Sequence, residues 1–194
     1  MNEIESRIKK SIAAKKAMLS KCTKAIEKAS NAMYQAIKKN KKILWCGNGG
    51  SAADAQHMAA ELMGGLVSHN RPPIPSVALT TDTSFLTAWT NDTDYETVFS
   101  RQIEGLGHEG DILLAISTSG NSINVINAVI AAKEKGIISI TLTGNGGGKL
   151  ASKSDIDICI PSDNTQIIQE GHLLAEHILC EILEQSIIKV LRKI

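Results

Sequence analysis

Short apolar runs that recur between loops and helical segments constrain the fold of this chain more than any other feature. The runs occupy residues 43–46, 76–79, 111–116, 137–142 and 156–160. Their apolar residues do not alternate with polar ones, which is typical of parallel strands covered by helices on both faces. Helical spacing of apolar residues follows three of these runs, at 51–63, about 123–135 and about 166–191. The pattern predicts an α/β fold, a three-layer αβα sandwich built on a five-stranded parallel sheet.

The first 40 residues have a different pattern, that of one long helix. Apolar residues recur every three or four positions from Ile4 to Ile37, and neither Gly nor Pro interrupts residues 3–40. A helix of this length spans about 55 Å and would extend beyond a domain of this size. Its apolar stripe then needs a second surface. The simplest source of that surface is another subunit, and the alternative is a helix that lies wholly across its own domain. We predict a single domain over 1–194, with 1–40 as an N-terminal helix for oligomer packing and 41–194 as the α/β core.

Charge and composition limit the partners of the chain. It has 21 Lys and Arg against 20 Asp and Glu, a formal charge of +1, so bulk charge indicates neither nucleic acid nor an anionic membrane surface as a partner. No apolar run approaches the ~18 residues that a membrane span requires, and the charged N-terminus lacks the apolar stretch of a signal peptide. Four scattered cysteines form no C-x-x-C pair and suit reduced, mostly buried thiols. We expect a soluble, cytoplasmic protein.

Two loops that follow apolar runs are suited to binding phosphate. The loop 117–122 (S-T-S-G-N-S) places four hydroxyl residues and a Gly before a helix, so that N–H groups, hydroxyls and the helix dipole can face a dianion. The loop 47–51 (G-N-G-G-S) repeats this arrangement without the P-loop sequence or the dinucleotide-binding spacing, which disfavours a nucleotide. Alternatively, Ser122 merely caps the following helix. A small phosphorylated metabolite is the predicted ligand, and the third loop, 144–148, is assigned no role.

Candidate chemical groups lie on two of the predicted helices. His57 and Glu61 are four residues apart and therefore share one helix face, where they could bind a metal or form an acid–base pair. An ordinary solvated pair is the alternative. The last helix carries several polar residues. They lie on a different face from its apolar residues, although the two faces are partly mixed: Gln169, His172, Glu176 and His177. Any one of these histidines is more often structural than catalytic.

Together these residues resemble the phosphoheptose isomerases (sedoheptulose-7-phosphate isomerases), a branch of the SIS sugar-isomerase family. The similarity covers nearly the whole chain and is carried by C-G-N-G-G-S-A-A-D-A-Q-H-M-A-A-E-L (46–62), A-W-T-N-D (88–92), S-T-S-G-N-S (117–122) and Q-E-G-H-L-L-A-E-H (169–177). The serine loop alone marks the wider SIS family, and the first and last segments combined are much more specific. The resemblance implies the SIS fold, a homotetramer with sites at subunit interfaces, and conversion of D-sedoheptulose 7-phosphate to D-glycero-D-manno-heptose 7-phosphate. This reaction would feed activated-heptose synthesis for lipopolysaccharide or capsule.

The resemblance also implies roles for individual residues. The acid–base residues would be Glu61, which moves the carbon-bound proton through a cis-enediol, and His177, which serves the oxygens. The sugar phosphate would contact Asn48, Gly49, Gly50, Glu61, Asn91, Asp92, Ser117, Thr118, Ser119, Ser122 and Gln169. One zinc ion per subunit would be held by His57, Glu61, Gln169 and His177, and would polarise the carbonyl.

One alternative stays open within this interpretation, and two outside it. A zinc-bound carboxylate is a weaker base, and Gln169 and His177 are about 12 Å apart along a regular helix, so an organising or dispensable zinc is an alternative to a catalytic one. A non-enzymatic SIS protein of the replication initiator-associating type is the main rival, which the presence of both Glu61 and His177 disfavours. The second rival is an isomerase of another phosphosugar, such as arabinose 5-phosphate or a hexulose phosphate. The long first helix and the histidine-bearing last helix favour the heptose branch.

Overall fold

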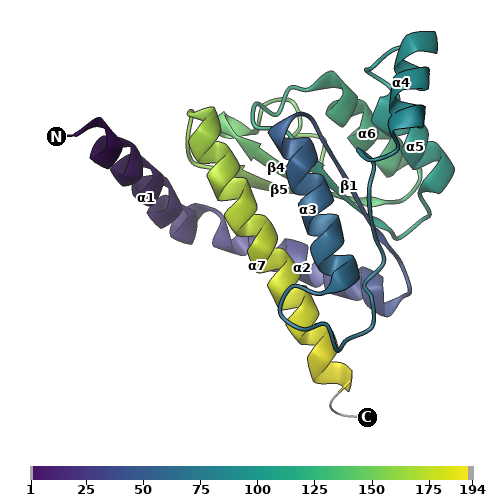
Figure 1. Ribbon diagram of the computed structural model, residues 1–194, viewed down its shortest axis with the longest axis horizontal. Helices are drawn as coiled ribbons and strands as arrows, with labels where there is room; N and C mark the ends of the chain where they lie inside the picture. The colour runs from purple at the N-terminus through teal and green to yellow at the C-terminus, as the bar shows by residue number, and fades with distance from the viewer. Residues whose placement is uncertain (1, 192–194) are drawn as a thin grey trace.

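The computed structural model describes residues 2–191, which contain one sheet of five parallel strands in the order β2-β1-β3-β4-β5. The strands are β1 (Ile43–Gly47), β2 (Ser76–Ala78), β3 (Ile112–Ile116), β4 (Ile138–Gly144) and β5 (Ile156–Ile160). Each strand lies within two residues of its predicted bounds. The predicted three-layer α/β fold is confirmed (Figure 1).

The strand order reverses beside β1, and this reversal locates the site. The chain runs from β1 outward to β2 and then returns to the other side of β1 to form β3. The carboxyl ends of β1 and β3 are therefore neighbours, with Gly47 in register with Ile116. In open parallel sheets, ligands bind in the crevice outside the strand ends at such a topological switch point. Both loops predicted to bind phosphate begin here.

Helices cover both faces of the sheet. One face packs against α2 (Thr23–Lys38), α3 (Gly50–Gly64) and α7 (Thr165–Leu191), and the other against α5 (Val98–Leu106) and α6 (Ile123–Glu134). Successive strand residues point to opposite faces, so Trp45 belongs to the first core and Leu44 to the second. Both side chains are fully buried. Within residues 2–191, no helix is long and apolar enough to cross a membrane.

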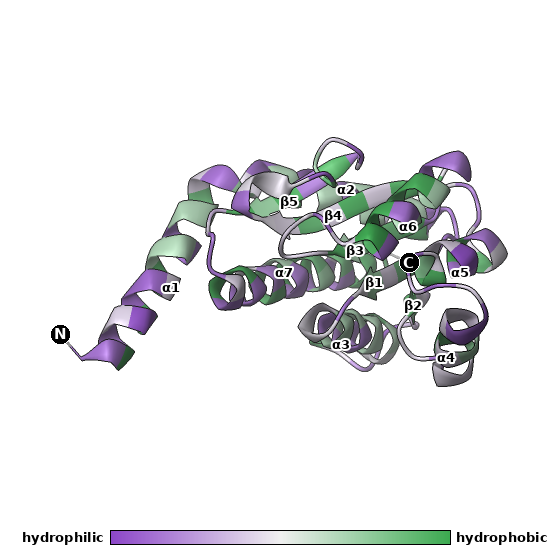
Figure 2. Cartoon of the chain, turned by 90° about the horizontal axis from the view of Figure 1, so that it is seen from above, coloured by the Kyte–Doolittle hydropathy of each residue, from purple (hydrophilic) through white to green (hydrophobic). Residues whose placement is uncertain are grey.

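The prediction of one helix over 3–40 is wrong, because the segment bends at Cys22 into α1 (Glu3–Lys21) and α2. The Cys22 thiol donates to the carbonyl of Cys159 in β5 at 3.3 Å, which ties the bend to the sheet. Thr23 donates its hydroxyl back to Leu19 O at 2.7 Å, a contact that bends helices. On the N-terminal side of the bend, α1 extends away from the core (Figure 2). The apolar stripe is exposed in the first turns of α1, whereas Ala14 and Met18 nearer the bend are buried. Ile4 and Ile8 on this stripe are 65% and 54% exposed.

Two helices between β2 and β3 were not predicted from the sequence. α4 (Thr83–Asp92) begins at Asp82, whose carboxylate accepts the N–H of Phe85 at 3.0 Å. That aspartate is a recognisable N-cap signal. α5 follows after a short loop and buries Phe99 and Ile103 against α6. The two helices complete the second layer and carry Asn91 and Asp92 at the end of α4.

Candidate active site

The two predicted phosphate loops lie side by side at the ends of β1 and β3. After β1, Gly49 adopts a φ of +56°, a conformation that favours glycine, and the chain turns directly into α3 at Gly50. After β3, Ser117 is buried and its hydroxyl lies 3.0 Å from that of Ser122, the residue before α6. Each loop thus ends at a helix N-terminus, where backbone N–H groups and the helix dipole favour an anion.

The third loop, to which the sequence assigned no role, supports the serine loop. It forms a short 3₁₀ turn, η1 (Asn145–Gly147), after β4. Gly144 N donates to Thr118 O at 3.0 Å, and Leu150 N donates to Gly120 O at 3.0 Å. Gly120 approaches so closely that a Cβ there would lie 2.0 Å from the carbonyl oxygen of Gly147. The glycines of the third loop therefore allow it to brace the backbone of residues 117–122.

The predicted acid–base residues come together between α3 and α7. His57 Nε2 lies 3.2 Å from Glu61 Oε1, and the His57 ring meets the His177 ring edge-on with 5.1 Å between centroids. His177 Nδ1 lies 2.9 Å from Leu173 O, so it carries the proton and donates it to that carbonyl. In the neutral ring, His177 Nε2 is then free to accept a proton. His57 thus contacts both Glu61 and His177, within one chain.

Gln169 lies across the first loop. A Cβ on Gly50 would come within 2.8 Å of Gln169 Nε2, so the side chain rests against the backbone where α3 begins. A groove of about 290 Å³ opens here between α3 and α7. Its lining includes Gly50, Asp54 and Gln169. Burial raises the pKa of Asp54, although the facing His57 and His177 act in the opposite direction.

Two polar residues of α7 are buried, contrary to the expectation that they share a polar face with Gln169 and His177. His172 and Glu176 are both 0% exposed. His172 Nε2 lies 3.0 Å from Thr143 O, and burial lowers the pKa of this histidine to about 4, which keeps it neutral. Burial, and to a lesser extent Asp54, raises the pKa of Glu176 to about 8. Neither carboxyl oxygen of Glu176 has a hydrogen-bond partner among residues 2–191.

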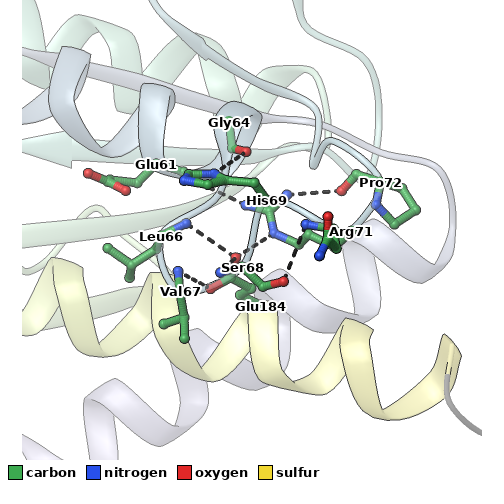
Figure 3. A network of polar contacts seen from close by, with 10 residues as sticks. Glu61, Gly64, Leu66, Val67, Ser68, His69, Arg71, Pro72 and Glu184 are labelled. Carbon is green, nitrogen blue, oxygen red and sulfur yellow. Dashed lines mark hydrogen bonds and ion pairs between the residues drawn. The ribbon is translucent and has the colours of Figure 1, made fainter.

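A buried ion pair fixes the end of α3 that carries Glu61 (Figure 3). Arg71 donates through Nε to Glu184 Oε1 at 2.7 Å and through Nη2 to the backbone carbonyl of Glu61 at 2.9 Å. Glu184, on α7, also accepts the N–H groups of the loop after α3, those of Leu66, Val67 and Ser68. The network joins α3 to α7 on the C-terminal side of His57 in α3 and of His177 in α7. Because the ion pair holds both helices, it sets how they approach each other.

The donor types around His57 are those that zinc takes. Imidazole nitrogens and carboxylates are common zinc ligands, and the contact of His177 Nδ1 with Leu173 O is the kind that orients a ligand imidazole. Within residues 2–191, however, no three His, Cys, Asp or Glu side chains converge closely enough to hold an ion. The chemistry of the donors fits zinc, whereas their present positions do not form a metal site.

The remaining predicted contacts, Asn91 and Asp92, hydrogen-bond to each other, with Asn91 Nδ2 2.8 Å from Asp92 Oδ1. The segment that follows is connected to the first loop by Tyr95, whose hydroxyl donates to Asn48 Oδ1 at 2.9 Å. Asn124 also hydrogen-bonds to Asn48. Sequence reasoning missed both Tyr95 and Asn124. An asparagine among the apolar residues of the first turn of α6 was a signal that could have identified Asn124.

Comparisons with known proteins agree with this architecture. The sequence model of the SIS domain family matches residues 8–144. The phosphoheptose isomerase of Sulfurimonas denitrificans is 50% identical over 186 residues, which cover 95% of each chain. That of Aneurinibacillus thermoaerophilus is 47% identical over 192 residues, or 97% of this chain and 96% of the relative.

Solved structures give the same result. The phosphoheptose isomerase of Neisseria gonorrhoeae superposes with a TM-score of 0.89 at 44% identity, covering 94% of this chain and 97% of the other. That of Francisella tularensis superposes with a TM-score of 0.91 at 40% identity and the same coverage. The fold and its two loops define a SIS-domain protein of the sugar-isomerase class. Within that class, the chain belongs to the phosphoheptose isomerase family.

Proposed function

We propose that this chain is an aldose–ketose isomerase that converts D-sedoheptulose 7-phosphate to D-glycero-D-manno-heptose 7-phosphate. The observation that carries the proposal is the contact of His57 with both Glu61 and His177. Through this contact, the carboxylate of Glu61 on α3 and the imidazole of His177 on α7 lie on either side of His57. α3 is also the helix that begins at a predicted phosphate loop. The names of the relatives, at about half identity over most of the chain, support the substrate.

The loops at the switch point would hold the phosphate and the sugar. In this proposal, backbone N–H groups at Gly49 and Gly50 and the hydroxyls of residues 117–122 bind the dianion. Gln169, which lies against Gly50, would contact the sugar between the loop and the histidines. Asn91 and Asp92 would bind sugar hydroxyl groups. Binding energy from these contacts would orient the first two sugar carbons toward α3 and α7.

Proton transfer would then fall to Glu61 and His177. Isomerisation removes a proton from C1 and returns one to C2 through a cis-enediol, so it needs a base beside these carbons and an acid for their oxygens. Glu61, whose side chain is 25% exposed, would carry the carbon-bound proton. His177, with Nδ1–H held by Leu173 O, would exchange protons with the oxygens through Nε2 whenever that nitrogen is not bound to a metal. His57 would hold Glu61 in place.

We further propose zinc as the metal of this site. His57, Glu61 and His177, together with Gln169, would hold it after the side chains converge, and the bound ion would supply polarisation of the substrate carbonyl. Metal analysis of the purified protein is expected to find one zinc per chain, and none in His57→Ala. Full activity of a zinc-free protein would show that the metal has no catalytic role.

The proposal extends to assembly and pathway. The exposed apolar stripe of α1 would pack against other subunits in a homotetramer, with sites at the subunit interfaces. The product would enter activated-heptose synthesis in the cytoplasm for lipopolysaccharide or capsule. Sedimentation showing only monomer at micromolar concentration would contradict the tetramer.

The direct test of the activity is incubation of purified protein with sedoheptulose 7-phosphate, followed by NMR of the sugar carbons. We expect a new aldose to accumulate to a fixed equilibrium ratio, and conversion about a thousandfold slower with Glu61→Gln. Absence of any aldose with wild-type protein would refute the enzymatic proposal. It would then favour the non-enzymatic interpretation, in which the same scaffold binds a protein partner.

A further inference from the structure

A pair of asparagine amides bridges the two loops at the switch point. Asn48 follows β1 directly, and Asn124 lies in the first turn of α6, just after the serine loop. Asn48 Nδ2 donates to Asn124 Oδ1 at 2.9 Å, and Asn124 Nδ2 donates back to Asn48 Oδ1 at 2.9 Å. This reciprocal pairing fixes both amides, because turning either one over would set donor against donor and acceptor against acceptor.

Tyr95 completes the hydrogen bonding of Asn48. Its hydroxyl donates to Asn48 Oδ1 at 2.9 Å, so that oxygen accepts two hydrogen bonds, its full capacity. Of the two N–H groups on Asn48 Nδ2, one is donated to Asn124. The other has no acceptor among residues 2–191. The side chain of Asn48 can therefore offer a ligand one thing only, a hydrogen-bond donor.

The position of this donor suits the proposed ligand. Asn48 is half-buried and precedes the exposed Gly49 in the first phosphate loop, whereas Asn124 is only 4% exposed and is anchored on α6. Asn124 Oδ1 also accepts the N–H of Val125 at 3.0 Å, which holds the anchoring amide in place. A sugar phosphate presents hydroxyl, carbonyl and phosphate oxygens, all of which accept hydrogen bonds.

We propose that Asn124 and Tyr95 are positioning residues that hold Asn48 as a donor to an oxygen of the bound sugar phosphate. Both act through Asn48. The inference rests on the proposed function for the identity of the ligand. It predicts that loss of either residue weakens binding more than it slows the chemical step, because the acid–base groups on α3 and α7 are untouched.

The test compares Asn124→Ala and Tyr95→Phe with wild type in steady-state kinetics and in calorimetric binding of sedoheptulose 7-phosphate. Asn124→Ala is expected to raise KM and the dissociation constant about tenfold and Tyr95→Phe about threefold, with kcat changed less than twofold, as the loss of one or two hydrogen bonds requires. The matched control is Asn31→Ala. Asn31 is exposed on α2, away from both loops, and accepts a hydrogen bond from Gln35, so its loss should leave KM unchanged.

A double-mutant cycle separates action through Asn48 from a structural effect. In an Asn48→Ala background, Asn124→Ala should cost no further affinity, because its partner is already gone. Additive losses would overturn the proposal, as would wild-type KM in a folded Asn124→Ala. If Asn124→Ala does not fold, Tyr95→Phe decides, since the Tyr95 side chain is 48% exposed and the ring is kept; an unchanged KM there refutes the proposal.

Inorganic phosphate as a competitive inhibitor identifies the accepting oxygen. If the inhibition constant of phosphate rises in the variants in parallel with the KM, the acceptor is a phosphate oxygen. If only the affinity for the sugar phosphate falls, the acceptor is a sugar oxygen. Both results support the proposal. A wild-type protein that binds sedoheptulose 7-phosphate without isomerising it would contradict the proposed function and leave the comparison of variants intact. A wild-type protein that binds neither ligand would overturn both.

Discussion

The two helical layers cover the sheet with different kinds of interior. On the side of α5 and α6 the buried side chains are mainly apolar, as with Ile103 and Val129, both fully buried. On the side of α2, α3 and α7 the apolar core also encloses ionisable groups: His172, Glu176 and Glu184 of α7 are all 0% exposed. Burial of such groups is costly unless they are paired, so a fold keeps them only where other contacts or a function compensate.

That difference places the proposed acid–base groups in one layer, between α3 and α7. The apolar layer contributes to the site only at its edge, through Asn91 and Asp92 of α4 and Asn124 of α6. The polar layer places His57, Glu61 and His177 next to groups whose pKa or hydrogen bonding is strongly altered by burial. Perturbed ionisable groups in a cleft are typical of functional sites. The following predictions test whether the two layers are as independent as this comparison implies.

The largest effect is expected for Glu61→Gln on the polar side. The variant keeps the shape of the side chain but cannot take a proton from carbon, so kcat should fall about a thousandfold while phosphate affinity and thermal stability are kept. NMR turnover, competitive inhibition by inorganic phosphate and a melting curve measure these three quantities. Glu181→Gln is the control on α7, since Glu181 is exposed and bonds only Gln185 among residues 2–191. Turnover near the wild-type rate in Glu61→Gln would remove this residue as the base.

The second effect concerns the ion pair between the polar helices. Arg71→Met leaves Glu184 buried without its charged partner and should lower the free energy of unfolding by about 3–5 kcal/mol in urea denaturation. Arg101→Met on the apolar side removes an exposed pair with Glu104 and should change it by less than about 1 kcal/mol. Equal losses in the two variants would contradict the contrast between the layers.

The sequence predicted the apolar framework well and the polar interior poorly, for physical reasons. The strand predicted at 111–116 is read from a local apolar run, and its burial on both faces follows from the parallel arrangement. The bend at Cys22 is held in part by a contact with Cys159, 137 residues away, which no local pattern reveals. α4 was missed although its Asp82 cap is a local signal.

The candidate site was predicted in its residue types rather than in its contacts. Spacing on one helix was sufficient to pair His57 with Glu61. The approach of His177 from α7 depends on how two helices pack, and came only with the family resemblance. The burial of Glu176 and the Asn48–Asn124 pair depend on tertiary packing and could not be read from helical periodicity alone.

The third effect is a pH dependence of stability on the polar side. Burial lowers the pKa of His172 to about 4 from an ordinary 6.5. Between these values the unfolded chain binds the additional proton, so this histidine makes the free energy of unfolding fall as pH drops from 6.5 toward 4, by at most about 3 kcal/mol. Denaturation across this range should show a flatter dependence in His172→Gln, and no flattening in His69→Gln, where the histidine is exposed. An unchanged slope in His172→Gln would show that His172 does not titrate as its burial implies.

The smallest effect is expected on the apolar side. Ile103→Val removes one buried methylene from the second core and should lower the free energy of unfolding by about 1 kcal/mol without altering kcat or KM. Denaturation and steady-state kinetics on the same preparation provide both values. A change in kcat comparable to that of a polar-side variant would mean that the apolar layer also tunes the site.

Hydrogen exchange at the sugar carbons during turnover tests the central claim most directly. Sedoheptulose 7-phosphate is incubated with the protein in D₂O until equilibrium and its carbons are followed by NMR. Proton transfer through a side chain between α3 and α7 predicts an aldose that carries deuterium at C2 and a ketose that gains it at C1. An equilibrium mixture without deuterium, or no aldose at all, would contradict the account.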